Sequence, residues 1–177
     1  VARIADMLLN PGDYVEYDGD AIQYPDVKLI YWAGGNPFHH HQDLNRLVSA
    51  WRRPDTVIVN EPWWSPIAKW ADIVFPATTS LERQDICASS HDNYAHFMER
   101  ALEPHHESKS DHEIFSLLAS KLGFGERFTE NKSEMEWLES IWQRSSSMAK
   151  SLGFELPSFD DFSLAGSYRL PERDRVG

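Results

Sequence analysis

The sequence is most informative at Val27-Lys-Leu-Ile-Tyr-Trp-Ala-Gly-Gly-Asn-Pro-Phe-His-His-His-Gln-Asp43. An apolar run breaks abruptly into two glycines, an amide and a proline before polar residues follow. Gly34 and Gly35 permit backbone conformations that other residues avoid and let a ligand approach the main chain, while Pro37 stiffens the exit from the turn. The stretch therefore predicts a buried strand over residues 27–33 that ends in a ligand-binding turn.

The same alternation of strand and helix continues along the chain. Helical spacing of apolar residues predicts a helix over residues 44–51, and β-branched residues predict a strand over 56–59. A short helix over 65–70 and a strand over 72–79 follow. Buried strands separated by helices imply a parallel sheet with helices on both faces. We therefore expect the α/β class, as a three-layer α/β/α sandwich with a mainly parallel, Rossmann-like sheet.

Two capping boxes open later helices. Ser110-Asp-His-Glu113 begins a helix that stops at Gly123, and Ser133-Glu-Met-Glu136 begins one that stops at Gly153. We expect the apolar stripe of the second helix to pack on the sheet. The predicted organisation is a helix and acidic connection over 1–26, an α/β domain over 27–153, and an extended C-terminal segment over 154–177 that runs over the surface towards a next domain.

Composition excludes several classes of protein. The net charge of −11 argues against a nucleic-acid surface, because no cluster of Lys and Arg could neutralise phosphates. The apolar runs are too short for a membrane helix, which needs about 20 residues. Cys87 is the single cysteine, so neither an internal disulfide nor a cysteine-ligated iron–sulfur cluster can form within this chain. We expect Cys87 to be a small buried thiol without a catalytic role, because no basic residue flanks it.

Polar groups follow all three predicted strands. In open parallel sheets, ligands bind beyond the carboxyl ends of the strands, where loops and helix N-termini present main-chain N–H groups. Glycine and amide N–H groups suit phosphate oxygens, a carboxylate suits ribose or guanine, and a guanidinium suits a diphosphate. Neither GxGxxG nor GxxxxGK[ST] is present, so an ordinary dinucleotide fold and a P-loop are not supported. The groups lie at Gly34-Gly35-Asn36, at Asn60-Glu61, and at Thr78-Thr79 followed by Arg83.

Two motifs carry a family resemblance. The glycine-rich stretch above and Ala77-Thr-Thr-Ser-Leu-Glu-Arg-Gln-Asp85 are similar to segments of the bis(molybdopterin guanine dinucleotide) enzymes of the dimethyl sulfoxide, trimethylamine N-oxide and biotin sulfoxide reductase group. The likeness extends from the N-terminus to about residue 162. Members of this group are several times longer, so we expect a fragment from the later half of such an enzyme.

The resemblance implies a molybdenum cofactor and a set of residues that bind it. It implies reduction of an S-oxide or N-oxide by oxygen-atom transfer in the complete enzyme, with the remaining domains of the polypeptide as partners and the molybdenum ligand outside this chain. Trimethylamine N-oxide, dimethyl sulfoxide, biotin sulfoxide and methionine sulfoxide stay open as substrates, the electron donor is unspecified, and both periplasm and cytoplasm stay open as compartments. The implied cofactor-binding residues are Gly35, Asn36, His40, Asn60, Glu61, Arg83 and Asp111.

Several residues also have a purely structural interpretation. Asn36 can be a turn former, and Arg83 can be a surface ion pair. Three consecutive histidines at 39–41 invite a metal site, but adjacent side chains do not converge easily on one ion, so we expect none. We expect most tryptophans, including the pair at 63–64, to be core or edge anchors, and the carboxylates at 160–161 to face solvent while neighbouring rings pack. The alternative for the whole chain is a stand-alone, noncatalytic nucleotide-binding or protein-interaction module.

Overall fold

The computed structural model describes residues 3–171 and divides into two compact units, one up to Ala77 and one from Thr78 onward. We call them unit 1 and unit 2 and describe each by itself. The predicted α/β domain over residues 27–153 crosses this boundary, so its extent stays a prediction. No helix among residues 3–171 has the length and apolarity needed to cross a bilayer.

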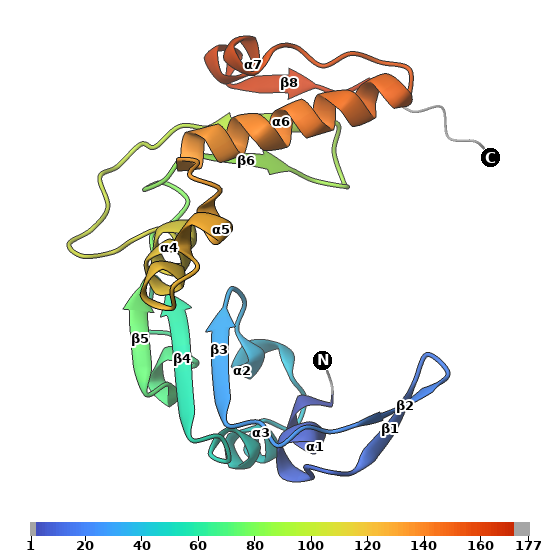
Figure 1. Cartoon of the computed structure of the whole chain (residues 1–177), viewed down its shortest axis with the longest axis vertical. Helices are drawn as coiled ribbons and strands as arrows, with labels where there is room; N and C mark the ends of the chain where they lie inside the picture. Colours follow the sequence, from blue (N-terminus) through green and yellow to red (C-terminus); the bar gives the residue numbers. More distant parts are fainter. Residues whose placement is uncertain (1–2, 172–177) are drawn as a thin grey trace. The chain divides into compact units, whose positions relative to one another are not determined.

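Unit 1 is built on a parallel sheet (Figure 1). The strands β3 (Leu29–Ala33), β4 (Thr56–Glu61) and β5 (Ile73–Pro76) lie in that order, with β4 in the centre. Ala33 lies opposite Asn60, and Glu61 lies opposite Pro76. The α/β class and the parallel sheet predicted from the sequence are confirmed, whereas the third layer of the sandwich stays a prediction.

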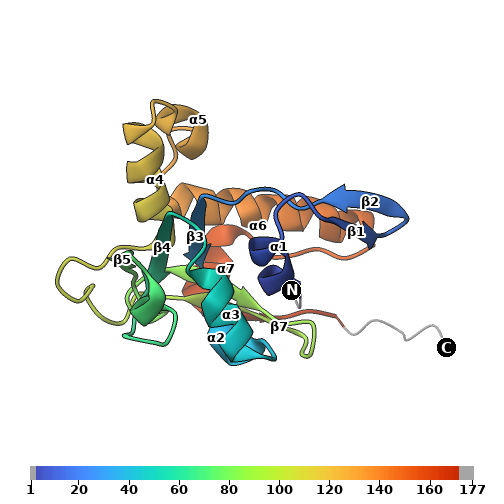
Figure 2. The ribbon, with the colours of Figure 1, turned by 90° about the horizontal axis from the view of Figure 1, so that it is seen from below.

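One face of this sheet carries the core of unit 1. Helices α1 (Ile4–Leu9) and α3 (Leu44–Trp51) pack together, as Figure 2 also shows. The fully buried side chains of α3 recur at helical spacing, at Leu47, Ala50 and Trp51, and they pack with Val57 and Val59 of β4. The predicted helix over 44–51 is therefore confirmed to the residue.

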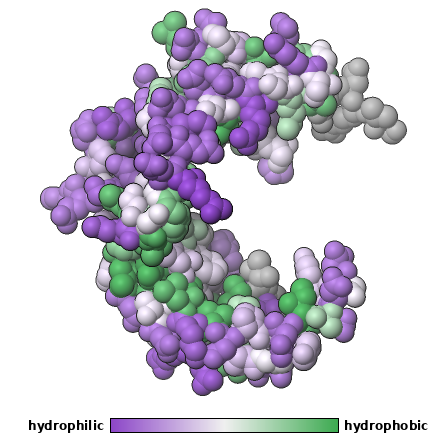
Figure 3. Space-filling view, viewed as in Figure 1, coloured by the Kyte–Doolittle hydropathy of each residue, from purple (hydrophilic) through white to green (hydrophobic). Residues whose placement is uncertain are grey.

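The opposite face of the sheet is more exposed. Because side chains alternate along a strand, Tyr31, Ile58, Asn60, Ile73 and Phe75 share this face. Ile73 is 43% exposed and Phe75 is 36% exposed, and Figure 3 shows hydrophobic residues gathered over β4 and β5.

Unit 1 also contains a hairpin that was not predicted from the sequence. Strands β1 (Tyr14–Tyr17) and β2 (Asp20–Gln23) pair antiparallel where only an acidic connection was predicted. Asp18 and Gly19 turn the chain with φ of +52° and +87°. Positive φ at both central residues is the geometry that Asp-Gly favours in a two-residue hairpin turn, so this part of the prediction was wrong.

Unit 2 contains an antiparallel sheet with helices packed on it. Its strands lie in the order β6 (Asp85–Ala88), β7 (Tyr94–Met98) and β8 (Ser167–Arg169). Helices α6 (Glu134–Ser151) and α7 (Phe159–Ala165) supply the rest of the core. The C-terminal segment expected to be extended therefore holds a helix and a strand within its described part.

The packing of α6 also differs from the prediction. Leu138 and Trp142 pack with Ala95 and Phe97 of the antiparallel sheet, not on the parallel sheet. Trp142 stacks on the fully buried Phe162 with ring centroids 3.8 Å apart. Hydrophobic spacing identifies the buried side of a helix but not the sheet that it meets. The outer part of the predicted stripe is exposed: Ile141 (47%), Met148 (63%) and Leu152 (53%).

Both predicted capping boxes are confirmed. Ser110 caps α4 (Asp111–Lys121) and Ser133 caps α6, and in each case the serine hydroxyl accepts from the backbone N–H of the glutamate three residues on, whose carboxylate accepts from the serine N–H. The short helix α5 (Gly125–Thr129) lies between them.

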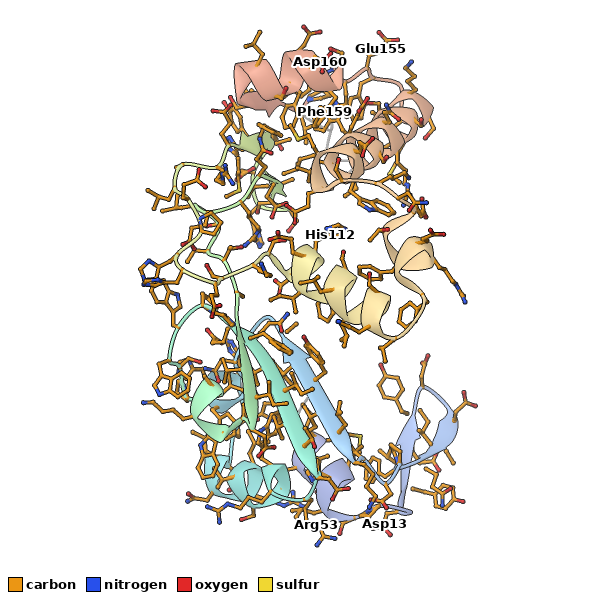
Figure 4. The ribbon with its side chains drawn as sticks, turned by 60° about the vertical axis from the view of Figure 1, so that its left-hand side comes forward. Asp13, Arg53, His112, Glu155, Phe159 and Asp160 are labelled. Atoms are coloured by element: carbon orange, nitrogen blue, oxygen red, sulfur yellow. The ribbon has the colours of Figure 1, made fainter. Side chains whose placement is uncertain are left out.

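Three further expectations concern single side chains. Cys87 is exposed, so the expectation of a buried thiol was wrong; it lies on β6 opposite His96. Trp63 and Trp64 are each 69% exposed and are not core anchors. Asp160 is exposed, while the ring of Phe159 packs against the ring of Phe97. Figure 4 labels Asp160 and Phe159. Solvent-facing carboxylates beside packed rings are therefore confirmed.

Candidate functional site

The first part of the site is the turn after β3. Gly34 and Gly35 have φ of +77° and +69°, which strains any other residue, and nothing lies within 4 Å of where a Cβ would stand at either position. Asn36 follows as the N-cap of α2 (Pro37–His40), where its Oδ1 accepts from the backbone N–H of Phe38 at 3.0 Å. The turn thus places two side-chain-free residues and one amide beyond the strand end.

The second part is the end of β4. Because β3 and β4 are parallel and Asn60 lies opposite Ala33, the end of β4 and the glycine turn lie at the same edge of the sheet. Asn60 is only 4% exposed, and Tyr31 donates its hydroxyl proton to Asn60 Oδ1 at 2.8 Å. Glu61 is half-buried, and its carbonyl accepts from the N–H of Ala77 at 3.4 Å.

His40 closes this group as the last residue of α2. Pro37 and Phe38 are buried and fix the helix, whereas His39 and His40 are exposed. Gly35, Asn36, His40, Asn60 and Glu61 therefore all lie in unit 1, on segments that leave the same edge. Within residues 3–171, no three His, Cys, Asp or Glu side chains are grouped closely enough to hold a metal ion.

The remaining predicted residues lie in unit 2. Arg83 is tied to its surroundings, since its Nε lies 3.2 Å from Asp85 Oδ2 and one terminal N–H group donates to the carbonyl of Thr78 at 3.3 Å. The ion pair that formed the structural interpretation of Arg83 is thus present. A guanidinium has five N–H donors, however, so these two contacts leave it able to donate further.

Arg83 and Asp111 share a cavity. Asp111 is the first residue of α4, and both residues line a cavity of about 370 Å³ together with His112. Trp137 and Leu138 of α6 supply an apolar wall. Figure 4 shows His112 at the beginning of α4. The structure therefore brings the two charged residues that the family resemblance singled out in unit 2 to one site.

A second, more polar cavity of about 440 Å³ also includes Arg83. Thr78 lines it, is 5% exposed, and its hydroxyl has no hydrogen-bond partner among the described residues. Ser110 and Glu134 line both cavities, and the Ser110 hydroxyl donates to the Glu134 carboxylate. Ser110 was predicted only as a helix cap and Glu134 was given no role, because the two residues lie 24 positions apart and nothing local indicates that they meet.

Glu82 organises the loop that presents Arg83. One carboxylate oxygen of Glu82 accepts from the Thr79 N–H at 2.7 Å and from the Thr79 hydroxyl at 2.8 Å, and the other accepts from the His105 N–H at 2.9 Å. The bonds from Thr79 are the main cause that lowers the pKa of Glu82 below its ordinary value. The Leu-Glu-Arg motif thus places a loop-fixing carboxylate next to the arginine.

Comparison with known proteins relates the chain to one protein family and to several reductases. Residues 7–121 match the family model described as "Molybdopterin oxidoreductase". The chain is 47% identical to a biotin sulfoxide reductase of Cereibacter sphaeroides over 99% of its length, and 49% identical to a trimethylamine-N-oxide reductase of Haemophilus influenzae over 92%. It is 46% identical to a dimethyl sulfoxide/trimethylamine N-oxide reductase of Rhodobacter capsulatus over 98%. The chain spans only 24%, 20% and 21% of these relatives.

A solved structure shares the fold. The acetylene hydratase of Pelobacter acetylenicus superimposes with a TM-score of 0.58 over 87% of this chain and 20% of its own, at 19% sequence identity. At that identity the match concerns the fold alone.

Proposed function

Because the chain belongs to the molybdopterin oxidoreductase family, we propose that it is the part of a longer molybdenum enzyme that holds the guanine-dinucleotide arm of a bis(molybdopterin guanine dinucleotide) cofactor. Membership of this family implies a molybdenum–molybdopterin cofactor. The observation that carries the proposal is the shared sheet edge, where a glycine pair with positive φ, a capping amide and a buried amide lie at the ends of two adjacent parallel strands.

The residues at this edge fit such a group. Open space at Gly34 and Gly35 lets phosphate oxygens or a ribose approach the main chain without meeting a side chain. Asn36 keeps its amide N–H₂ for a ligand, since only Oδ1 serves the cap of α2. The carboxylate of Glu61 suits ribose hydroxyls or guanine N–H groups, and His40 can donate or accept from the end of α2.

In unit 2, Arg83 and Asp111 supply opposite charges to one cavity. A guanidinium binds a diphosphate in a planar, two-pronged geometry that lysine cannot reproduce. The carboxylate of Asp111 suits hydroxyl or N–H donors of the cofactor. The apolar wall from Trp137 and Leu138 lowers the local dielectric, which strengthens such contacts.

For the complete enzyme we propose reduction of a small S-oxide or N-oxide. Three relatives that match along nearly the whole chain carry the names biotin sulfoxide, trimethylamine-N-oxide and dimethyl sulfoxide reductase. In such a reaction the substrate loses one oxygen atom, which leaves as water with two protons and two electrons from a donor. The molybdenum centre supplies the oxygen-atom transfer. The residues of this chain bind and orient the remote arm of the cofactor, and so place its reactive end.

A stand-alone nucleotide-binding or interaction module is the competing function. It would bind a free guanine nucleotide with the same strand-end residues. The identity of 46–49% to reductases, continuous over more than nine-tenths of the chain, favours the molybdenum enzyme.

The test uses the complete enzyme with Asn36→Ser. Serine keeps the oxygen that caps α2 but removes the amide N–H₂ groups. We expect less guanine and molybdenum per polypeptide, with viologen-driven reduction of trimethylamine N-oxide, dimethyl sulfoxide and biotin sulfoxide falling in proportion. Asn45→Ser, at an exposed position of α3, is the matched control and should retain both. Full guanine content and turnover in Asn36→Ser would refute the role of the turn, and unchanged binding of free guanosine diphosphate without any molybdenum in the wild type would favour the competing module.

A further inference from the structure

Thr78, at the start of unit 2, has a buried hydroxyl group that the chain leaves unpaired. The residue is 5% exposed, and its Oγ1 has no hydrogen-bond partner within the described part of the chain. Its main chain is held on both sides: its N–H donates to the carbonyl of Lys109 at 3.0 Å, and its carbonyl accepts from Arg83 at 3.3 Å. A buried hydroxyl without a partner costs free energy, because folding removes it from water without replacing the lost bond. The side chain is therefore fixed in place with one donor to spare.

Thr78 belongs to the wall of the polar cavity of about 440 Å³ that Arg83 also lines. Because Arg83 donates to the carbonyl of Thr78, the guanidinium and the threonine are neighbours on this wall. A hydroxyl group turns its proton towards an acceptor without moving the rest of the side chain. The Thr78 hydroxyl bonds to none of the carboxylates on the wall, and three of these already accept from other donors: Glu82 from Thr79 and His105, and Glu113 and Glu134 from Ser110.

We infer that Thr78 is a further cofactor-binding residue, whose hydroxyl donates a hydrogen bond to an oxygen of the guanine-dinucleotide arm beside Arg83. The inference rests on the proposed function, because it requires the arm to enter this cavity. Phosphate and ribose oxygens both accept from a hydroxyl, and a guanidinium beside it attracts the same oxygens. The bond would satisfy on binding a donor that stays unpaired in the empty cavity, so it stabilises the loaded enzyme and not the apo-enzyme.

The experiment uses the complete enzyme with Thr78→Val, which replaces the hydroxyl by a methyl group of similar size. Two quantities are measured: the rate at which purified loaded enzyme loses guanine, and the urea midpoint of apo-enzyme from a host that cannot make the cofactor. One neutral hydrogen bond corresponds to a change of about 2- to 10-fold, so we expect Thr78→Val to lose guanine faster by that factor. The urea midpoint of the apo-enzyme should not fall, because the substitution removes no hydrogen bond within the chain.

Thr78→Ser should give the reverse pattern. Serine keeps the hydroxyl, so guanine should be lost at a rate within about 2-fold of the wild-type rate, whereas the missing buried methyl group should lower the urea midpoint of the apo-enzyme. Thr56→Val, at the other end of β4 from Asn60, is the matched control and should leave guanine loss unchanged. A purely structural Thr78 would move guanine retention and the apo midpoint in the same direction in both variants, and that result would overturn the inference.

Arg83→Ala separates the inference from the proposed function beneath it. If Arg83→Ala retains guanine as the wild type does, the arm does not enter this cavity and the proposed role of unit 2 is wrong. If Arg83→Ala loses guanine and Thr78→Val loses it no faster than the wild type, the cavity is right, and the Thr78 hydroxyl does not bind the cofactor.

Discussion

The two units present their polar groups in different ways. In unit 1 the groups come from the ends of adjacent parallel strands, so the topology alone brings Gly35, Asn36 and Asn60 to one edge. In unit 2 the groups come from a loop and a helix start, and they are engaged with one another: Arg83 with Asp85, and Ser110 with Glu134. A strand-end site is thus a property of the sheet, whereas the charged cavity depends on individual side-chain contacts.

The largest expected effect concerns the separate cores. Phe162→Ala removes a fully buried ring that stacks on Trp142, and large-to-small substitutions of this kind cost about 3–5 kcal/mol. Among residues 3–171, none belongs to both hydrophobic clusters, so hydrogen exchange should accelerate in β6–β8, α6 and α7 while β3–β5 stay protected.

Leu47→Ala is the mirror variant in unit 1. It should cost about 2–5 kcal/mol and expose β3–β5 to exchange while unit 2 stays protected. Equal loss of protection in both units from either substitution would show that the described chain unfolds as one cooperative body.

The next effect concerns Arg83. A charge-assisted contact to a diphosphate contributes about 1.5–3 kcal/mol, so Arg83→Ala in the complete enzyme should weaken cofactor binding about 10- to 100-fold. Guanine and molybdenum content per polypeptide measure this, with circular dichroism to verify the apo fold. Arg144→Ala, at an exposed position of α6, is the control and should leave cofactor content unchanged. Arg100 is less suitable as a control, because it lines the same polar cavity as Arg83. Full cofactor occupancy in Arg83→Ala would mean that Arg83 serves only in its ion pair with Asp85.

A smaller effect follows from Glu82. Its pKa is lowered in the folded chain, chiefly by the two bonds from Thr79. A carboxyl whose folded pKa is depressed contributes stability that is present above its unfolded pKa, near 4.3, and that is lost as pH falls through the folded value.

Glu82→Gln should therefore lower the urea midpoint at pH 7, and the difference from wild type should shrink below about pH 4. Glu16→Gln, on the exposed hairpin, is the control and should leave the urea midpoint at pH 7 unchanged. A Glu82→Gln deficit that is equally large at pH 3 would mean that the charge of the carboxylate is not what holds this loop.

The smallest effect is at Cys87. Cys87→Ser should leave turnover of the complete enzyme nearly unchanged, because serine is of similar size and the thiol is exposed. In the isolated chain the exposed thiol should react readily with Ellman's reagent. A loss of turnover with full cofactor content would assign Cys87 a role that its surroundings do not indicate.

Sequence periodicity predicts unit 1 better than unit 2 for a physical reason. Strand β4 is a run of β-branched residues with one buried face, two glycines follow β3, and helix α3 has a clear apolar side, so each carries its own signal. Strand β6 does not alternate in burial, β7 alternates over only five residues, and the three residues of β8 pair with β7 across a long separation in sequence. Long-range pairing of this kind leaves no local pattern.

Two of the missed elements did carry local signals. Asp18-Gly19 is the turn that a two-residue hairpin favours, and Ser158 with Asp161 forms a helix start that Gly166 ends with φ of +70°. The exposure of Cys87 and of the tryptophan pair could not be predicted, because the exposure of a side chain in a strand or loop depends on what packs against it rather than on its residue type.

The candidate site divides in the same way. Gly35, Asn36, Asn60 and Glu61 follow from strand ends, which the hydrophobic runs locate directly. Tyr31 was overlooked as a hydrogen-bond partner of Asn60 because an aromatic residue in an apolar strand looks like core, although its period-two relation to Ala33 places it on the Asn60 face. The meeting of Ser110 with Glu134 depends on how α4 and α6 are arranged in unit 2, which sequence spacing does not encode.

The proposed function requires the carboxyl edge of β3 and β4 to hold the guanine-dinucleotide arm of the cofactor. The most direct measurement is an experimental structure of the complete enzyme with its cofactor bound. We expect oxygen or nitrogen atoms of the guanine-dinucleotide arm within hydrogen-bond distance, about 3.2 Å or less, of the Gly35 or Asn36 backbone and of the Asn60 amide. A cofactor whose nucleotide arm lies away from this edge, with water or another protein segment against Asn36 and Asn60, would contradict the account.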